Sequence, residues 1–279
     1  MSRGTLFVVA TPIGNLEDIT LRAIDVLKTC ALIAAEDTRT AKKLTDRHAI
    51  STPLMSFHEH SGPGRVAELV KMLEGGKSVA LISEAGTPGL SDPGEALIHA
   101  AAAAGIAVVP IPGAAAFVVA LSASGLPMAR VAFEGFLPAK PADRRKRLAS
   151  LARESRTMAF YEAPHRIAES LADMRDALGA ARRACVAREL TKIHEEFERA
   201  TLGQLAERWA KREPRGEFTV LIEGSAETEE AQSGDVEGAL RAALAAGKSV
   251  SAAAKEVAAA LGRPRNVVYA MALRLEGRS

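Results

Sequence analysis

Short apolar runs alternate with amphipathic segments from residue 5 to about residue 112. Within residues 65–73, for example, apolar side chains recur every three or four positions, which predicts a helix with one buried face. Alternation of strands with helices is typical of a mostly parallel sheet that is flanked by helices. We therefore predict five strands in this region, at residues 5–10, 31–35, 54–57, 78–82 and 107–109.

A second group of apolar runs begins near Val131 and is less regularly spaced, which indicates a mixed sheet. Residues 112–126 separate the two groups. We predict an N-terminal α/β domain over residues 1–115 and a C-terminal α/β domain over residues 116–224, with a ligand cleft between them. The strands predicted for the second domain are residues 131–137, 157–161, 184–188, 197–200 and 218–223.

The last part of the chain reads as a helical appendage over residues 235–279. Residues 224–234 are acidic and rich in Ala, Ser and Glu, and we interpret them as a linker. Three amphipathic patterns follow, at residues 235–246, 251–261 and 264–275. Gly247 and Gly262 are expected to end helices, Ser251 to cap one and Pro264 to occupy a first turn. The appendage is either a helix-turn-helix module or a packing or dimerisation element.

Three of the predicted strands end in loops that are rich in Gly, Pro or other small residues, at residues 11–15, 83–94 and 110–116. Open α/β sheets bind their ligands at such loops, beyond the carboxyl ends of the strands. Neither a Walker sequence nor Gly-x-Gly-x-x-Gly follows the first strand, which argues against a nucleotide polyphosphate. The pattern predicts a pocket for a small polar cofactor without phosphate.

Composition narrows the class of protein. The 279 residues are 48% hydrophobic, as expected of a globular protein, and only 4% aromatic. The net charge of +2 means that affinity for nucleic acid must come from local patches. Two distant cysteines, Cys30 and Cys185, suit a reducing compartment and buried positions. Prolines and glycines interrupt the uncharged stretch 96–128, so we predict a cytoplasmic protein without a membrane span.

The densest basic run follows the first strand of the second domain. Phosphate contact and a solvated helix face are both open interpretations of this run. The arginines of the helical tail favour RNA contact in the same way. The candidate RNA-binding residues are Lys140, Arg144, Arg145, Lys146, Arg147, Arg263 and Arg265.

Polar residues also cluster at strand ends, at residues 36–39, 58–60, 161–166 and 188–196. No zinc-type spacing joins their histidines and carboxylates, and we expect no metal. No Gly-x-Ser-x-Gly elbow or Cys/His arrangement supports a covalent hydrolase. Carboxylates and cationic side chains beside a cofactor cleft instead favour proton removal and charge stabilisation during group transfer.

Seven segments, in this order along the chain, resemble one family: residues 11–20, 36–39, 83–94, 112–114, 135–138, 161–166 and 188–196. The chain is similar to the ribosomal RNA small subunit methyltransferase I family of the tetrapyrrole methylase superfamily. The resemblance implies two α/β domains of the tetrapyrrole methylase type, S-adenosylmethionine in the cleft between them and a homodimer. It also implies 2′-O-methylation of a cytidine in the decoding centre of 16S ribosomal RNA. Glu84 departs from the family, which commonly has Asp there.

The resemblance also assigns residues to the cofactor and to the chemistry. The cofactor is expected to contact Ile13, Gly14, Ala85, Gly86, Thr87, Leu90, Ala114, Ala115, Ala116, Tyr161, Leu190 and Thr219. Lys192, Arg166 or Arg39 would stabilise the developing oxyanion, and Glu189, Glu162, His58 or His165 would accept the proton. Two alternatives stay open: methylation of a tetrapyrrole ring carbon, and a non-enzymatic RNA-binding assembly factor.

Overall fold

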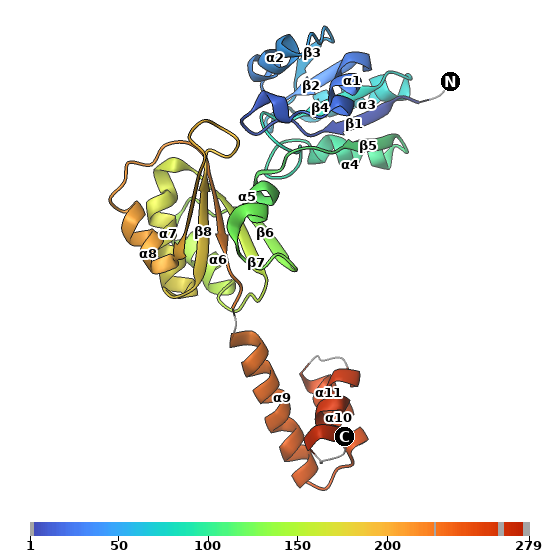
Figure 1. Cartoon of the computed structure of the whole chain (residues 1–279). Coiled ribbons are helices and arrows are strands. Elements are labelled where there is room, and N and C mark those ends of the chain that lie inside the picture. The colour runs from blue at the N-terminus through green and yellow to red at the C-terminus, as the bar shows by residue number, and fades with distance from the viewer. Residues whose placement is uncertain (1–2, 226, 262–264, 276–279) are drawn as a thin grey trace. The chain divides into compact units, whose positions relative to one another are not determined.

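The computed structural model describes residues 3–225, 227–261 and 265–275 (Figure 1). The chain forms two compact units. The first comprises Met1–Ser150 and Thr157–Glu223, and it holds two five-stranded sheets. The second comprises Leu151–Arg156 and Gly224–Ser279, and it holds three helices.

The first sheet is entirely parallel and has the order β3-β2-β4-β1-β5. Parallel strands place all their carboxyl ends at one edge, so the loops after β1, β2, β4 and β5 are neighbours there. Each strand matches one of the five predicted ones within two residues. The strands are β1 (Thr5–Val9), β2 (Leu32–Ala35), β3 (Leu54–Ser56), β4 (Val79–Ile82) and β5 (Ala107–Ile111).

Helices cover both faces of this sheet, as Figure 1 shows. Along β4, Ala80 and Ile82 pack in one core with α1 and α2, whereas Val79 and Leu81 pack in another with α3 and α4. Because side chains alternate between the faces of a strand, a strand buried on both faces reads as a continuous apolar run. The helices are α1 (Leu21–Thr29), α2 (Thr38–Arg47), α3 (Pro63–Glu74) and α4 (Glu95–Ala103), and a 3-10 turn, η1 (Leu16–Asp18), precedes α1.

The second sheet is mixed and has the order β6-β7-β10-β8-β9. Only β6 and β7 pair in parallel, and the remaining pairs are antiparallel. These strands also match the predicted ones within about a residue at each end. They are β6 (Val131–Phe136), β7 (Thr157–Glu162), β8 (Arg183–Arg188), β9 (Glu196–Thr201) and β10 (Phe218–Ile222).

One face of the second sheet packs against α5, in a core that contains Ala120, Ala159, Cys185 and Leu221. Cys185 and Cys30 are both buried free thiols, which confirms their predicted role as small core residues. The remaining helices are α5 (Ala116–Ser124), α6 (Pro141–Ser150), α7 (Ile167–Leu178) and α8 (Leu202–Trp209), and η2 (Pro164–Arg166) leads into α7.

The second unit contains α9 (Glu227–Ala245), α10 (Val250–Ala260) and α11 (Arg265–Leu275) around its own apolar core. Helix α9 begins within the segment that we predicted to be a linker, which corrects that prediction. The N-cap of α10 is Ser249, whose side chain accepts from the backbone N–H of Ala252, and not Ser251. Gly247 follows α9 with φ +82°, as its predicted capping role requires. Gly262 and Pro264 lie outside the described residues.

Among the described helices, none is both long enough and apolar enough to cross a bilayer.

Candidate functional site

A pocket of about 350 Å³ lies within the first unit, at the carboxyl ends of the first sheet's strands. Its walls come from the loops after β1, β2, β4 and β5 and from residues of the second sheet. This volume is in the usual range for small-molecule sites. The lining residues are Ile13, Glu36, Glu84, Ala85, Gly86, Thr87, Leu90, Ser91, Asp92, Ala115, Ala116, Phe136, Tyr161, Glu162, Ala163, Pro164, Leu190, Glu217, Phe218 and Thr219.

The loop after β4 supplies seven of these residues and is held by the loop after β1. Gly86 and Thr11 exchange two backbone hydrogen bonds, at 2.8 Å and 3.1 Å. Gly86 has φ +86°, and a Cβ there would meet Ile13 Cγ2 at 3.5 Å and Ala114 O at 3.7 Å. The left-handed backbone favours glycine at this position, whereas the contacts of such a Cβ would be ordinary ones. The loop thus presents bare backbone to the pocket.

The loop after β5 joins the same wall. The hydroxyl of Thr87 donates to Ala114 O at 3.2 Å, so Ala114 supports the lining from behind. Helix α5 begins at Ala116, and the backbone N–H of Phe117 donates to the Tyr161 hydroxyl at 3.3 Å. Burial raises the pKa of Tyr161, so this phenol stays protonated at neutral pH.

The opposite wall is a strained turn around Leu190. Glu189 and Thr191, which flank it, have φ of +52° and +63°. Gly14 faces this turn, and a Cβ on Gly14 would lie 2.6 Å from Leu190 O. The backbone N–H of Asn15 also donates to Thr191 Oγ1 at 3.0 Å. Gly14 therefore permits a close approach of two backbones and is not itself among the lining residues, and its contact with the cofactor stays a prediction.

The pocket is acidic. Five carboxylates line it, and none of the lining residues, all of them described, is Lys, Arg or His. Burial raises the pKa of Asp92 to about 6, with further repulsion from Glu36 and Glu84. Burial also raises the pKa of Glu36, which accepts a hydrogen bond from the backbone N–H of Glu84 at 3.2 Å. Such a field favours a cationic ligand and opposes phosphate.

Glu189 and Lys192, two predicted catalytic residues, form an ion-pair network beside the pocket. Lys192 Nζ donates to Glu189 Oε1 at 2.8 Å and to the lining residue Glu217 at 2.9 Å. Burial opposes ionisation of Glu189, but hydrogen bonds from Lys192 and from the backbone N–H of Glu217 outweigh it and lower the pKa of Glu189. A Cβ on Gly216, which has φ +90°, would lie 2.5 Å from the Glu189 side chain. Both predicted residues are therefore held by partners and lie outside the lining.

Arg166 lies behind the pocket and holds Glu162. Its Nε donates to Glu162 Oε1 at 2.8 Å, and Ser170 Oγ donates to Glu162 Oε2 at 2.5 Å. This carboxylate is therefore engaged on both oxygens. Arg39 pairs with Asp37 at 2.7 Å with 89% of its side chain exposed, and His165 and His58 are also exposed. The structure does not place Arg39, His165 or His58 in the lining.

The basic run forms α6, and its members separate by face. Arg144 is buried. Its charge is compensated there, since its Nε donates to Asp173 Oδ2 at 2.6 Å and its guanidinium contacts Glu169. This finding corrects the prediction that Arg144 belongs to an exposed RNA surface. Lys140, Arg145, Lys146 and Arg147 are exposed, and Arg147 pairs with Glu134. Arg265 is exposed in α11, whereas Arg263 lies outside the described residues.

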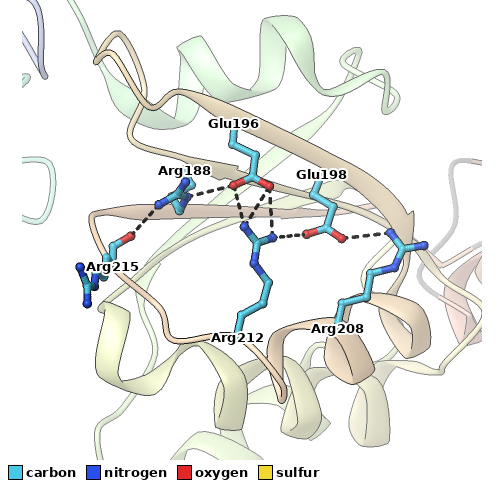
Figure 2. Close-up of polar contacts among 6 residues, drawn as sticks. All are labelled: Arg188, Glu196, Glu198, Arg208, Arg212 and Arg215. Carbon is cyan, nitrogen blue, oxygen red and sulfur yellow. Dashed lines mark hydrogen bonds and ion pairs between the residues drawn. The ribbon is translucent and has the colours of Figure 1, made fainter.

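The polar cluster at the ends of β8 and β9 forms a salt-bridge network. Figure 2 shows Glu196 and Glu198, two residues apart on β9, both bound to Arg212, at 3.0 Å and 3.2 Å. Hydrogen bonds from Arg212 lower the pKa of Glu196. Because β9 is the edge of its sheet, these charges oppose further strand pairing. Within the described residues, no group of three His, Cys, Asp or Glu is placed to hold a metal ion.

Nine of the twenty lining residues had no predicted role in binding or catalysis, and they include Asp92, Phe136 and Glu217. All three lie in or next to motifs that were recognised, since Asp92 is in the loop after β4 and Phe136 ends β6. Spacing within a loop does not tell which side chain turns inward. Ser91, which directly precedes Asp92, has φ +65°, and this left-handed conformation could not be read from the sequence of the loop.

Known proteins resemble this chain along its whole length. Residues 5–206 match the family model "Tetrapyrrole (Corrin/Porphyrin) Methylases", and residues 230–276 match "RsmI C-terminal HTH domain". "Ribosomal RNA small subunit methyltransferase I" of Pseudomonas aeruginosa is 50% identical over 284 residues, which cover 100% of each chain.

Solved structures share the fold at lower identity. The methyltransferase CobJ is 22% identical with a TM-score of 0.61, over 80% of this chain and 95% of that one. Uroporphyrin-III C-methyl transferase from Thermus thermophilus, solved with S-adenyl homocysteine, is 16% identical with a TM-score of 0.56, over 78% and 96%. The fold is thus that of the tetrapyrrole methylases. The relatives that match over the full length are ribosomal RNA small subunit methyltransferases I. The chain belongs to the tetrapyrrole methylases and, within them, to the ribosomal RNA small subunit methyltransferase I family.

Proposed function

We propose that this protein transfers a methyl group from S-adenosylmethionine to a ribose 2′-hydroxyl of a cytidine in small-subunit ribosomal RNA. The observation that carries the proposal is the acidic pocket at the sheet's carboxyl edge, in a chain of this family. The family supplies the class of reaction and of substrate. The residues of the pocket supply the means to hold the cofactor and to take up the proton.

The residues present fit this cofactor. Small or backbone-presenting residues, Ala85, Gly86, Ala115 and Ala116, leave room for a flat ligand, and Ile13, Leu90 and Leu190 add apolar contacts. When bound, S-adenosylmethionine supplies an electrophilic methyl group on a positively charged sulfur. The carboxylates of Glu36, Glu84 and Asp92 favour that charge. Tyr161 and Thr219 complete the predicted set on the side of the second sheet.

Asp92 is the proposed proton acceptor. Of the lining carboxylates, Glu162 is bound by Arg166 and Ser170, Glu217 by Lys192, and Glu36 by a backbone N–H. Asp92 has a hydrogen bond with Ser83, and no cation pairs with it among the described residues. A carboxylate with a pKa of about 6 is ionised at neutral pH yet more basic than an ordinary one. Asp92 would take the proton of the 2′-hydroxyl as the oxygen acquires the methyl group.

The other predicted catalytic residues remain proposals, and we propose that three of them position other side chains. Lys192 and Arg166 each hold a lining carboxylate, so we assign them to positioning Glu217 and Glu162. Glu189 holds Lys192 in the same network. Arg39 and His165 lie outside the lining and would act only on a bound RNA strand.

The exposed face of α6 is the proposed RNA surface. Arg145 and Lys146 are exposed there, and Lys140 is exposed directly before the helix. Arg147 adds to them although it also contacts Glu134. Lysine and arginine on one helix face bind phosphate by displacing counterions. In the appendage, Arg265 and Arg263 are proposed as further contacts. A homodimer and a cytoplasmic location complete the proposal, and the two buried free thiols are compatible with a reducing compartment.

Methyl incorporation tests the proposal. Purified protein is incubated with radiolabelled S-adenosylmethionine and small ribosomal subunits that lack the modification, and separately with uroporphyrinogen III. We expect label in 16S ribosomal RNA alone. Label in the tetrapyrrole alone would replace the substrate class. Label in neither, with normal cofactor binding, would favour an RNA-binding factor.

A further inference from the structure

Strand β6 contains a bulge beside the pocket. In its pairing with β7, Phe133 lies opposite Ala159 and Gly135 lies opposite Phe160, so Glu134 is an extra residue in the ladder. Gly135 has φ +65°. Bulges bend a strand and re-aim the side chains that follow, and they are frequent next to active sites.

The bulge puts Phe133 and Phe136 on the same face of the sheet. Residues three apart on a regular strand point to opposite faces. Here Phe133 pairs with Ala159 and Phe136 pairs with Tyr161, and these two partners are two residues apart on β7. Both phenylalanines therefore face the side on which Tyr161 lines the pocket.

The two rings differ in what covers them. Phe133 is stacked on Phe117, with ring centroids 4.5 Å apart, and it also contacts Tyr161. Phe136 touches the edge of Tyr161, with centroids 5.6 Å apart, and it lines the pocket. Yet 53% of Phe136 is exposed. An aromatic residue that is fixed on one side and open on the other presents a flat apolar surface at the pocket mouth.

The same bulge adjoins the loop that carries Asp92. A Cβ on Gly135 would lie 3.0 Å from Ser91 Oγ, so the side chain of Ser91 lies against Gly135. Ser91 itself has φ +65° and directly precedes Asp92. Strained residues of this kind persist where the surroundings hold them, and they concentrate at functional sites. Phe136 and Asp92 therefore line one pocket, and the residues that directly precede them, Gly135 and Ser91, lie against each other.

Exposed cations follow Phe136 along the chain. Lys140 lies four residues later, and Arg145 and Lys146 are on the exposed face of α6. An aromatic platform beside basic residues is the general arrangement for single-stranded nucleic acid, where bases stack and phosphates bind cations. Enzymes that modify a nucleotide within folded RNA or DNA likewise stack the extruded base on an aromatic side chain.

We propose that the ring of Phe136 stacks on the pyrimidine base of the acceptor nucleotide and thereby places its ribose beside Asp92. This inference rests on the proposed function, because it names the subsite that the acceptor occupies. The bulge at Glu134 is the feature that makes the subsite possible, since it brings Phe136 to the face of Tyr161.

Three variants test the subsite: Phe136→Leu, Phe136→Tyr and, as a control, Met128→Ala. Met128 is also an exposed apolar residue, 59% accessible, and it is not in the lining. Each protein is assayed for methyl transfer to unmodified small subunits, for affinity for S-adenosylhomocysteine by calorimetry and for oligomeric mass. We expect Phe136→Leu to lower kcat/KM by about tenfold or more through loss of stacking, with unchanged cofactor affinity and mass. Phe136→Tyr, which keeps a ring for stacking, should retain most of the activity that Phe136→Leu loses, and Met128→Ala should resemble the wild type.

Four results would overturn the inference. Two concern activity, namely wild-type activity in Phe136→Leu and equal losses in the Leu and Tyr variants. The third is a fall in cofactor affinity that accounts for the loss of rate, which would assign the ring to the cofactor. A change in oligomeric mass would likewise assign it to a subunit contact. Absence of methylation by the wild type would refute the proposed function itself, and that result is distinct from all of these.

Discussion

Arg144 in α6 and Asp173 in α7 form a buried ion pair, in which Nε of the arginine donates to Oδ2 of the aspartate at 2.6 Å. Only 3% of the Arg144 side chain is exposed. We expect Arg144→Ala to lower the free energy of unfolding by about 3 kcal/mol, because it removes the closer and buried cation that pairs with Asp173. Urea unfolding, followed by circular dichroism, measures this loss.

The neighbouring Arg145 supplies the control. It lies 3.8 Å from the same aspartate, but 60% of its side chain is exposed. Arg145→Ala should change the free energy of unfolding by less than about 0.5 kcal/mol. Equal losses in the two variants would contradict the division of α6 into a buried and an exposed face.

Neutralising the exposed cations of α6 should weaken RNA binding. We expect the triple change of Lys140, Arg145 and Lys146 to Gln to reduce affinity for small subunits. The slope of log affinity against log salt should fall by about 0.7 to 0.9 for each phosphate group that the variant no longer binds. Filter binding at several salt concentrations measures both quantities. The control is the double change Lys28→Gln and Lys71→Gln, at two exposed lysines in helices of the first sheet. An unaltered slope in the triple variant would show that the exposed face of α6 contacts only solvent.

Gly86→Val should weaken binding of S-adenosylmethionine. Its Cβ would enter the space beside Ile13 and Ala114, and its φ of +86° is unfavourable for a β-branched residue. Gly89→Val is a matched control, because Gly89 has φ +85° and lies in the same loop but not in the lining. Calorimetry on folded protein should give a larger loss of affinity for Gly86→Val. Equal affinities would remove the β4 loop from the cofactor site.

Activity should depend on the ionisation of Asp92. With a pKa of about 6, kcat/KM should be level above pH 6 and should decrease by about tenfold per pH unit well below it. Asp92→Asn should lower kcat by about 100-fold or more and abolish this acidic limb.

The stability of the same variant separates catalysis from folding. The folded state raises the pKa of Asp92 above its ordinary value, so its stabilising contribution is present below about pH 4 and is lost as the pH rises through 6. Asp92→Asn should therefore cost no stability at pH 7. A large loss of stability there, or an unchanged pH profile, would contradict the role of Asp92 as the base.

Most of the fold could be predicted from the local pattern of apolar and polar residues. Apolar runs such as Val79–Ile82 are buried on both faces of their sheet, so a continuous apolar run identified the strand without any knowledge of its partners. The loops after β1, β4 and β5 could also be predicted from local sequence, because glycine and proline mark the ends of these strands. Ten of the twelve residues predicted to bind the cofactor line the pocket, whereas Gly14 and Ala114 support it from behind.

What escaped prediction depends on contacts between distant segments. Arg144 lies one helical turn before the buried Leu148, and that spacing was the available signal for its burial within a basic run. Phe136 required the register of β6 against β7, and a one-residue bulge reverses the face on which it lies. The early start of α9 reflects Glu, Ala and Gln, which favour helix although their composition also suits a linker.

Ribose methylation of 16S ribosomal RNA in cells tests the central claim most directly. Mass spectrometry of the decoding-centre fragment compares a strain that lacks the gene, the same strain with the wild-type gene and the same strain with Asp92→Asn. The account predicts that 2′-O-methylcytidine disappears in the deletion, returns with the wild type and does not return with the variant. Unchanged ribose methylation in the deletion strain would contradict it.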